Sequence, residues 1–284
     1  MSSTVRELQQ RAAQAGLPRL ETQLLLAALL GKDRSWLITH DEDPLPAGTG
    51  ERFDDWLRQR LDDVPLAYLT GHKEFHGLRL QVSPATLVPR PDTEVLVDWA
   101  LRWLAGCGLA APQVLDLGTG SGAIALAVKK GHPQACMTAT DFSAAALEVA
   151  SANARNLDLD VRFLQGAWWQ PLGEVCFDLV LSNPPYIAPQ DGHLPALKHE
   201  PLSALAAPEE GLADLRQIIA GASAHLRPGG LLLLEHGYDQ EQAVADLLRD
   251  AGLLYQGCQR DLGGQPRCSG ALRPSTPASI RQRS

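Results

Sequence analysis

The chain has 284 residues, of which 45% are hydrophobic and 20% are charged, so it can bury a sizeable core and is not globally disordered. Its 25 Lys and Arg against 33 Asp and Glu give a net charge of −8, which argues against a protein whose main work is to bind nucleic-acid phosphates. Five cysteines without a Cys-x-x-Cys pair are typical of free thiols in a reducing compartment. Because the N-terminus has no apolar signal segment and no stretch could span a membrane, we expect a cytoplasmic protein without membrane contact.

Residues 1–64 are expected to form a small helical domain. Thr4 and Glu7 have the spacing of a capping box, which marks the start of a first helix. A second helix should begin near Pro18, and a third should span residues 51–61. The segment carries 8 basic and 11 acidic side chains, so it is not a basic arm for nucleic acid.

Residues 65–90 alternate apolar and polar side chains, with Gly71 and Gly77 as breakers, which predicts a β-hairpin linker. His72 and His76 have the i,i+4 spacing of zinc ligands on a helix. Because the segment is predicted to be a hairpin instead, we expect no metal site there.

From Gln113 onward, apolar strands alternate with helices. The predicted strands are 113–117, 135–141, 161–165, 177–183 and 229–237, and the predicted helices are 124–130, 143–156, 211–226 and 240–251. This alternation predicts an α/β fold with a doubly wound, mostly parallel sheet, which we place at residues 91–270. Residues 271–284 are polar and rich in Pro and Ser, and are expected to be a flexible tail.

A glycine-rich turn follows the first of these strands. Its sequence is Asp116-Leu-Gly-Thr-Gly-Ser-Gly122, with the spacing G-x-G-x-G. Ligands of open α/β sheets bind at the carboxyl ends of the strands, and glycines let a ligand approach the backbone closely. The spacing is not that of dinucleotide enzymes, and no Lys follows as in a P-loop. Asp141 ends the second strand, where an acid accepts from ribose hydroxyls or stabilises the following helix, and both roles remain open.

Asn183-Pro-Pro-Tyr186 ends the buried strand at 177–183. Two prolines prevent the strand from continuing and leave a stiff, extended segment. The Asn183 side-chain carbonyl and the Pro184 backbone carbonyl can accept both N–H bonds of one planar –NH2 group, and Tyr186 offers a flat face to it. Holding both hydrogens orients the nitrogen and favours positive charge on it.

The two motifs together resemble those of Rossmann-like S-adenosylmethionine-dependent methyltransferases that act on planar nitrogens. Residues 65–97 ("PLAYLTGHKEFHGLRLQVSPATLVPRPDTEVLV"), 200–205 ("EPLSAL") and 229–237 ("GGLLLLEHG") are similar to the peptide chain release factor N5-glutamine methyltransferases, the PrmC or HemK family. The resemblance implies that S-adenosylmethionine is the cofactor and that class 1 release factors, methylated on the glutamine of a Gly-Gly-Gln motif, are the protein partners. It implies a monomer that contacts no nucleic acid directly, with no metal and no covalent intermediate.

The resemblance also assigns site residues. Gly118, Thr119, Gly120, Ser121 and Gly122 are expected to line the methionine part of the cofactor. Asp141 is expected at the ribose, Trp168 at the adenine and Thr93 at the amino-acid end. Asn183, also at the cofactor, is expected to hold the glutamine amide together with Pro184, Pro185 and Tyr186. The family usually has an acid before the aromatic residue of the loop after the third strand, whereas this chain has Ala167.

Two other functions share some of these sequence features. An adenine-N6 DNA methyltransferase shares the Asn-Pro-Pro-Tyr chemistry, but it usually needs a basic groove-reading region, and residues 1–64 are acidic. A non-catalytic module that docks a partner through its N-terminal helices is disfavoured by the intact Gly118 and Asn183. The chain's own Gly263-Gly264-Gln265 is expected to be a turn between two late strands rather than a site of self-methylation.

Overall fold

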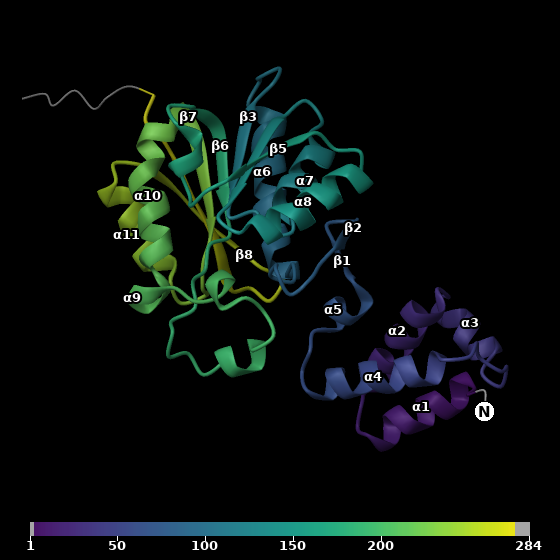
Figure 1. The fold of residues 1–284 in the computed structure, drawn as a ribbon. Helices are drawn as coiled ribbons and strands as arrows, with labels where there is room; N and C mark the ends of the chain where they lie inside the picture. Colours follow the sequence, from purple (N-terminus) through teal and green to yellow (C-terminus); the bar gives the residue numbers. More distant parts are fainter. Residues whose placement is uncertain (1–2, 276–284) are drawn as a thin grey trace, which may run out of the picture. The chain divides into compact units, whose positions relative to one another are not determined.

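The computed structural model describes residues 3–275. The chain divides into two compact units that join in sequence between His72 and Lys73 (Figure 1). Within residues 3–275, no helix combines the length and the apolar character needed to cross a membrane.

The first unit consists of short helices, as the sequence predicts. Its first four helices are α1 (Val5–Gln14), α2 (Arg19–Leu30), α3 (Arg34–Thr39) and α4 (Thr49–Leu61). The capping box is confirmed: the Thr4 hydroxyl accepts from the Glu7 amide at 3.2 Å, and the Glu7 carboxylate accepts from the Thr4 amide at 3.1 Å. The core of this unit is made of buried apolar side chains that include Val5, Leu8, Leu25, Leu26, Leu37 and Phe53.

A fifth helix, α5 (Leu66–Thr70), lies where the sequence suggests the beginning of the hairpin linker. Pro65 sets the entry to this helix, and Gly71 ends it in the left-handed region at φ 76°. Leu66 and Leu69 pack against the core of the first unit. Packing of these half-buried leucines therefore favours a helix over the strand that the alternation indicates.

The predicted hairpin is present over a shorter range. β1 (His72–Phe75) and β2 (Leu78–Gln81) are joined by His76 and Gly77, which both have positive φ. Two such residues form the turn that matches the twist of an antiparallel pair. His72 thus begins β1 and His76 lies in the turn after it, so the two residues are separated by four extended positions, about 13 Å, rather than by one turn of a helix.

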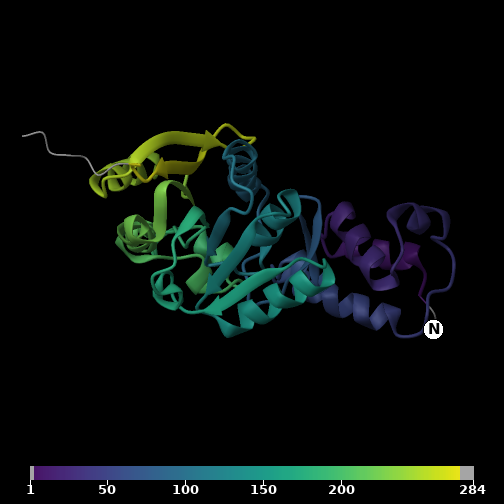
Figure 2. The same ribbon diagram turned by 90° about the horizontal axis from the view of Figure 1, so that it is seen from above.

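The second unit is built on a seven-stranded sheet in the order β5-β4-β3-β6-β7-β9-β8. Pairs within β3 to β7 are parallel, whereas β9 is antiparallel to both of its neighbours, which confirms the predicted mostly parallel sheet. Figures 1 and 2 show β8 and β9 in yellow at one end of the sheet. The strands are β3 (Gln113–Leu117), β4 (Cys136–Asp141), β5 (Val161–Gln165), β6 (Phe177–Ser182), β7 (Leu226–Glu235), β8 (Leu254–Arg260) and β9 (Pro266–Leu272).

Helices cover both faces of this sheet (Figure 1). On one face lie α6 (Glu94–Gly106), α7 (Ala123–Gly131) and α8 (Ala144–Asn156), and on the other lie α10 (Ala213–His225) and α11 (Glu241–Asp250). Successive side chains of a strand point to opposite faces of the sheet. Val114 therefore packs in the core under α6, α7 and α8, and Leu115 packs in the core under α10 and α11. Four of these helices match predicted ones within a few residues, whereas α6 has no counterpart in the sequence analysis.

The chain ends differ slightly from the prediction. β9 continues through Leu272, two residues into the predicted flexible tail, and the Arg273 amide then donates to the Gly230 carbonyl at 2.8 Å. Residues 276–284 of that tail lie outside the described residues. The Gly-Gly-Gln sequence is in the turn between β8 and β9, which the Asp261 amide closes by donating to the Gln265 carbonyl at 2.9 Å.

One glycine holds a second loop against the segment that follows β6. α9 (Pro208–Gly211) ends in Gly211 at φ 83°, where a Cβ would lie 2.0 Å from the Tyr186 carbonyl oxygen. Gly211→Ala should lower the free energy of unfolding by at least about 2 kcal/mol through steric overlap and left-handed strain. Gly106→Ala is the control, because a Cβ there meets nothing within 4 Å and alanine favours a helix. Denaturant unfolding that shows both variants equally stable would contradict this account.

Candidate active site

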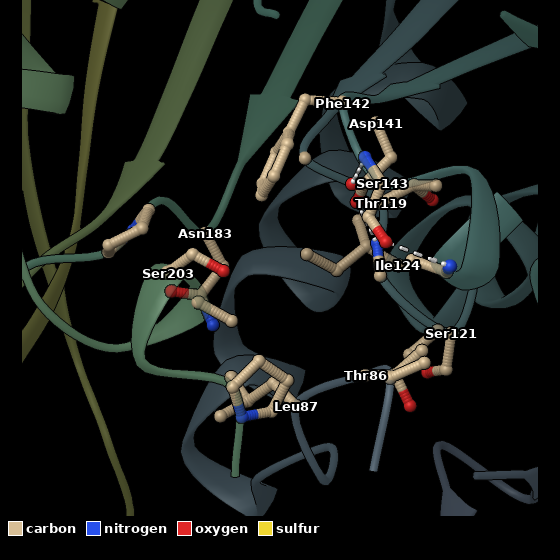
Figure 3. A pocket seen from close by; sticks show the side chains of 18 of the residues that line it. Thr86, Leu87, Thr119, Ser121, Ile124, Asp141, Phe142, Ser143, Asn183 and Ser203 are labelled. Atoms are coloured by element: carbon tan, nitrogen blue, oxygen red, sulfur yellow. Dashed lines mark hydrogen bonds between the residues drawn. The ribbon is translucent and has the colours of Figure 1, made fainter. Parts of the chain in front are cut away.

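A cavity of about 390 Å³ opens at the carboxyl ends of the parallel strands, a size that suits a small molecule with several functional groups. Figure 3 shows Asn183 and Ser203 on one side of it, and Thr119 and Asp141 on the other. The strand order reverses between β3 and β6, and the loops after both strands line the cavity. This reversal point is where open α/β sheets bind their ligands.

Most of the predicted site residues line this cavity. They are Gly118, Thr119, Gly120, Ser121, Asp141, Trp168, Asn183, Pro185 and Thr93. Gly122 instead precedes α7 at φ 83°, where a Cβ would lie 3.1 Å from the Leu126 side chain, so its role is close packing. Pro184 is buried, and the Tyr186 hydroxyl donates to Glu235. Neither is in the cavity wall.

The glycine turn is held by the neighbouring strand. Gly118 and Thr119 both donate their amides to the Thr140 carbonyl at 2.9 Å. Gly118 and Gly120 have φ values of 72° and 56°, a region that glycine adopts without strain. The loop after β3 is thus fixed to the end of β4, with its backbone facing the cavity.

Asp141 joins this turn to the next helix. One carboxylate oxygen accepts from the Gly120 amide at 2.9 Å, and the other accepts from the Ser143 amide at 2.9 Å. Burial raises the pKa of Asp141, and these backbone hydrogen bonds oppose the shift. A carboxylate offers about four acceptor positions and three backbone amides act on this one, those of Gly120, Phe142 and Ser143, so the helix role and an acceptor role toward a ligand hydroxyl are compatible.

Asp116, the acid at the end of β3, is fully buried and was not predicted as a site residue. Its Oδ2 accepts from the Thr119 hydroxyl at 2.6 Å and from the Ala125 amide at 3.2 Å. Its Oδ1 has no hydrogen-bond partner among residues 3–275. Burial raises the pKa of Asp116 to about 7. The carboxyl group therefore orders the turn, and its desolvation costs free energy. In the sequence, an acid inside an apolar strand was the signal that could have identified Asp116 as a site residue.

The far wall of the cavity is formed by Trp168 and an acid from α10. The Trp168 ring lies over the turn, because a Cβ on Gly118 would come within 3.2 Å of its Cζ3. Asp214 lines the same cavity; burial raises its pKa, and a hydrogen bond from Trp168 opposes that shift. Ala167 also lines the wall, and Asp214 brings a carboxyl group to the same cavity.

The Asn183-Pro-Pro-Tyr186 segment leaves β6 with its side chains already engaged. The Asn183 Nδ2 donates to Thr93 Oγ1 at 3.3 Å, and the Tyr186 hydroxyl donates to Glu235 Oε1 at 3.2 Å. Burial raises the pKa of the Tyr186 hydroxyl, which therefore stays a donor. Gln240 holds the backbone by donating to the Tyr186 carbonyl at 3.0 Å.

The remaining wall consists of two loops joined by one buried acid, Glu200, which sequence reasoning did not select. Its carboxylate accepts from the Val88 amide at 2.9 Å and forms a short ion pair with Arg90. Since Arg90 and the neighbouring Pro201 both line the cavity, Glu200 fixes the two loops to each other there.

Substitution of Asp141 tests whether its carboxylate binds the cofactor. Asp141→Asn should raise the Kd of an adenosine-containing cofactor about 10-fold to 100-fold, since a charged acceptor contributes about 1.5–3 kcal/mol. Calorimetry measures this Kd, with Glu148→Gln on the exposed side of α8 as the control. Unchanged affinity in Asp141→Asn would leave this acid only its role at the start of α8.

Two family profiles match the chain. The first is described as the PrmC N-terminal domain and covers residues 4–71, and the second is the methyltransferase small domain and covers residues 97–200. Among solved structures, a methyltransferase from Pyrococcus furiosus has the same fold, with a TM-score of 0.53 and 20% identity over 70% of this chain and 90% of that one.

Curated relatives match nearly the whole chain. The release factor glutamine methyltransferase of Bordetella pertussis is 49% identical over 91% of this chain and 96% of its own length. The release factor glutamine methyltransferase of Xylella fastidiosa is 48% identical over 90% of this chain and 94% of its own length. With this identity across both units, the chain belongs to the release factor glutamine methyltransferases, the S-adenosylmethionine-dependent PrmC/HemK family.

Proposed function

We propose that this protein transfers a methyl group from S-adenosylmethionine to the side-chain amide nitrogen, N5, of the glutamine in the Gly-Gly-Gln motif of class 1 peptide chain release factors. The observation that carries the proposal is the orientation of the Asn183 side-chain amide at the cavity wall. Its NH2 group is engaged by Thr93, which leaves Oδ1 as the free acceptor. We propose the Pro184 carbonyl, in the next residue but outside the cavity lining, as the second of the two acceptors that one amide –NH2 group requires.

The cavity also suits the cofactor. S-adenosylmethionine brings a methyl group that is already activated on a sulfonium. The backbone of 118–121 would line the methionine part, with Thr93 at its amino-acid end, and Asp141 would accept from the ribose hydroxyls. Trp168 would contact the adenine, beside the acceptor that Asp214 provides. The close approach of the Trp168 ring to Gly118 supports this fit, because any side chain at position 118 would crowd the ring.

The chemistry asked of the protein is alignment. An amide nitrogen is a poor nucleophile because its lone pair is delocalised into the carbonyl group. Accepting both of its hydrogens at Asn183 and Pro184 fixes the direction of the nitrogen and stabilises the positive charge that grows on it. Since the prolines stiffen this segment, little reorganisation accompanies the reaction.

The helical unit is proposed to recognise the release factor away from the methylated loop. A Gly-Gly-Gln tripeptide offers few contacts and must be ordered on binding, which costs free energy. A second contact surface would raise the effective concentration of the glutamine at Asn183. Exposed apolar side chains on this unit, Leu20, Leu24, Ile38 and Leu61, are candidates for that surface.

Asn183→Ala tests the proposed acceptor. Incubation of the wild type with cofactor and intact release factor should add one methyl group to the Gly-Gly-Gln glutamine, read by mass spectrometry. The variant should turn over about 100-fold more slowly, the effect of losing one preorganised acceptor, while cofactor affinity falls much less. Asn156→Ala, exposed at the end of α8, is the control. A variant with more than half the wild-type rate would refute the role of Asn183.

Removal of residues 1–71 tests the helical unit. If the remaining unit binds cofactor normally, activity on intact release factor should fall at least about tenfold, because the second contact is lost. Activity on a short Gly-Gly-Gln peptide should change far less. Equal losses on both substrates would mean that the helices support the catalytic unit rather than recognition.

A further inference from the structure

Among residues 3–275, Arg90 is the only Lys, Arg or His that lines the cavity, and the other charged residues of the wall are the acids Asp141 and Asp214. The Arg90 side chain is 37% exposed. A cation at this wall opposes the binding of a second cation. S-adenosylmethionine carries a positive sulfonium, whereas its demethylated form, S-adenosylhomocysteine, carries a neutral thioether at the same position. The charge of the wall therefore acts on one form of the cofactor more than on the other.

Arg90 is paired with Glu200, whose side chain is only 2% exposed. The guanidinium forms a short ion pair with Glu200 Oε1, and the Val88 amide donates to Oε2 at 2.9 Å. The chain before this acid is also held, because the Glu200 amide donates to the Leu197 carbonyl at 2.9 Å. Glu200 is thus a fixed anion behind the wall, and the longer, more exposed Arg90 side chain is the partner that it holds in place.

We propose that Glu200 is a positioning residue that holds the Arg90 guanidinium and cancels its charge, so that the cavity accepts a cationic cofactor. Without the carboxylate, the guanidinium is free to turn toward the cavity that Arg90 lines, and its charge is unpaired. Repulsion then weakens the binding of S-adenosylmethionine more than that of S-adenosylhomocysteine. A purely structural acid would affect both forms alike, since they differ only in one methyl group and its charge. The inference rests on the proposed placement of the cofactor in this cavity.

Asp178 offers a matched control at the opposite edge of the sheet. Its Oδ2 accepts from the Gln113 amide at 2.7 Å and forms an ion pair with Arg227 at 2.8 Å, and its side chain is 8% exposed. Like Glu200, it joins a backbone amide to a guanidinium, but it does so at the amino ends of β3, β6 and β7 and outside the cavity wall. Asp178→Asn therefore measures what the loss of such a contact does to stability alone.

Calorimetry on the full chain tests the proposal through one quantity, the Kd of S-adenosylmethionine divided by the Kd of S-adenosylhomocysteine. Glu200→Gln should raise this ratio at least about fivefold, because an unpaired cation then faces the sulfonium. Arg90→Met should lower the ratio, because Glu200 then contributes an unpaired negative charge. The double variant Arg90→Met/Glu200→Gln should return the ratio to within about twofold of the wild-type value, since neither charge remains. Asp178→Asn should leave the ratio unchanged, whatever stability it loses.

Parallel changes in both Kd values would overturn the inference alone. In Glu200→Gln they would mean that Glu200 is only a structural tie, and in Arg90→Met that Arg90 binds a group common to both forms, such as the cofactor carboxylate. If Glu200→Gln does not fold, Arg90→Met still decides. No change in either Kd in any variant would place the cofactor outside this cavity and overturn the proposed placement as well. Since no release factor enters these measurements, their failure is distinguishable from failure of the proposed substrate.

Discussion

The last pair in the β3–β6 ladder is the contact on which the site depends. Leu117 and Ser182 are partners in that parallel register, and the Ser182 hydroxyl donates to the Leu117 carbonyl at 2.7 Å. The residues that follow these partners in sequence are Gly118 after β3 and Asn183 after β6, so the strand pairing places the glycine turn beside the amide acceptor. A one-residue slip of β6 would exchange its side chains between the two packed faces and move Asn183 about 3.3 Å along the strand relative to Gly118. The apolar side chains of β3 and β6 on both sheet faces therefore fix the register that assembles the two halves of the chemistry.

The segment after β6 is rigid because several distant elements hold it. Its prolines restrict the backbone. The Gln240 side chain donates a hydrogen bond to the Tyr186 carbonyl, and Gly211 lets a loop approach that carbonyl closely. The same loop holds Glu209 and Glu210 at positive φ, which is strained for non-glycine residues. Two buried carboxyl groups, Asp116 and Glu235, lie next to the two motifs with their pKa values raised to about 7. Unfavourable conformations and desolvated acids are thus concentrated around the site, where alignment is the protein's main contribution.

Much of this could be predicted from the sequence, because the motifs are local. The glycine turn, Asp141 and the Asn-Pro-Pro-Tyr segment each follow a recognisable strand, and the carboxyl ends of parallel strands share one edge of a sheet. The helix α5 was missed because packing of the half-buried Leu66 and Leu69 against the core of the first unit overrides a weak alternation. Glu200 and Asp214 could not be placed, since their partners Val88, Arg90 and Trp168 lie far from them in sequence. Glu235 did leave a signal, an acid at the end of a run of four leucines, but its partners appear only once β6 and β7 pair.

The central claim is that Asn183 Oδ1 and the Pro184 carbonyl together accept the two hydrogens of the glutamine amide. A crystal structure of this protein with a release factor and the demethylated cofactor tests it most directly. The account predicts the glutamine Nε2 at about 3 Å from both oxygens, with Asn183 Nδ2 still on Thr93. A glutamine amide held by other groups, or an Asn183 whose NH2 faces the substrate, would contradict it.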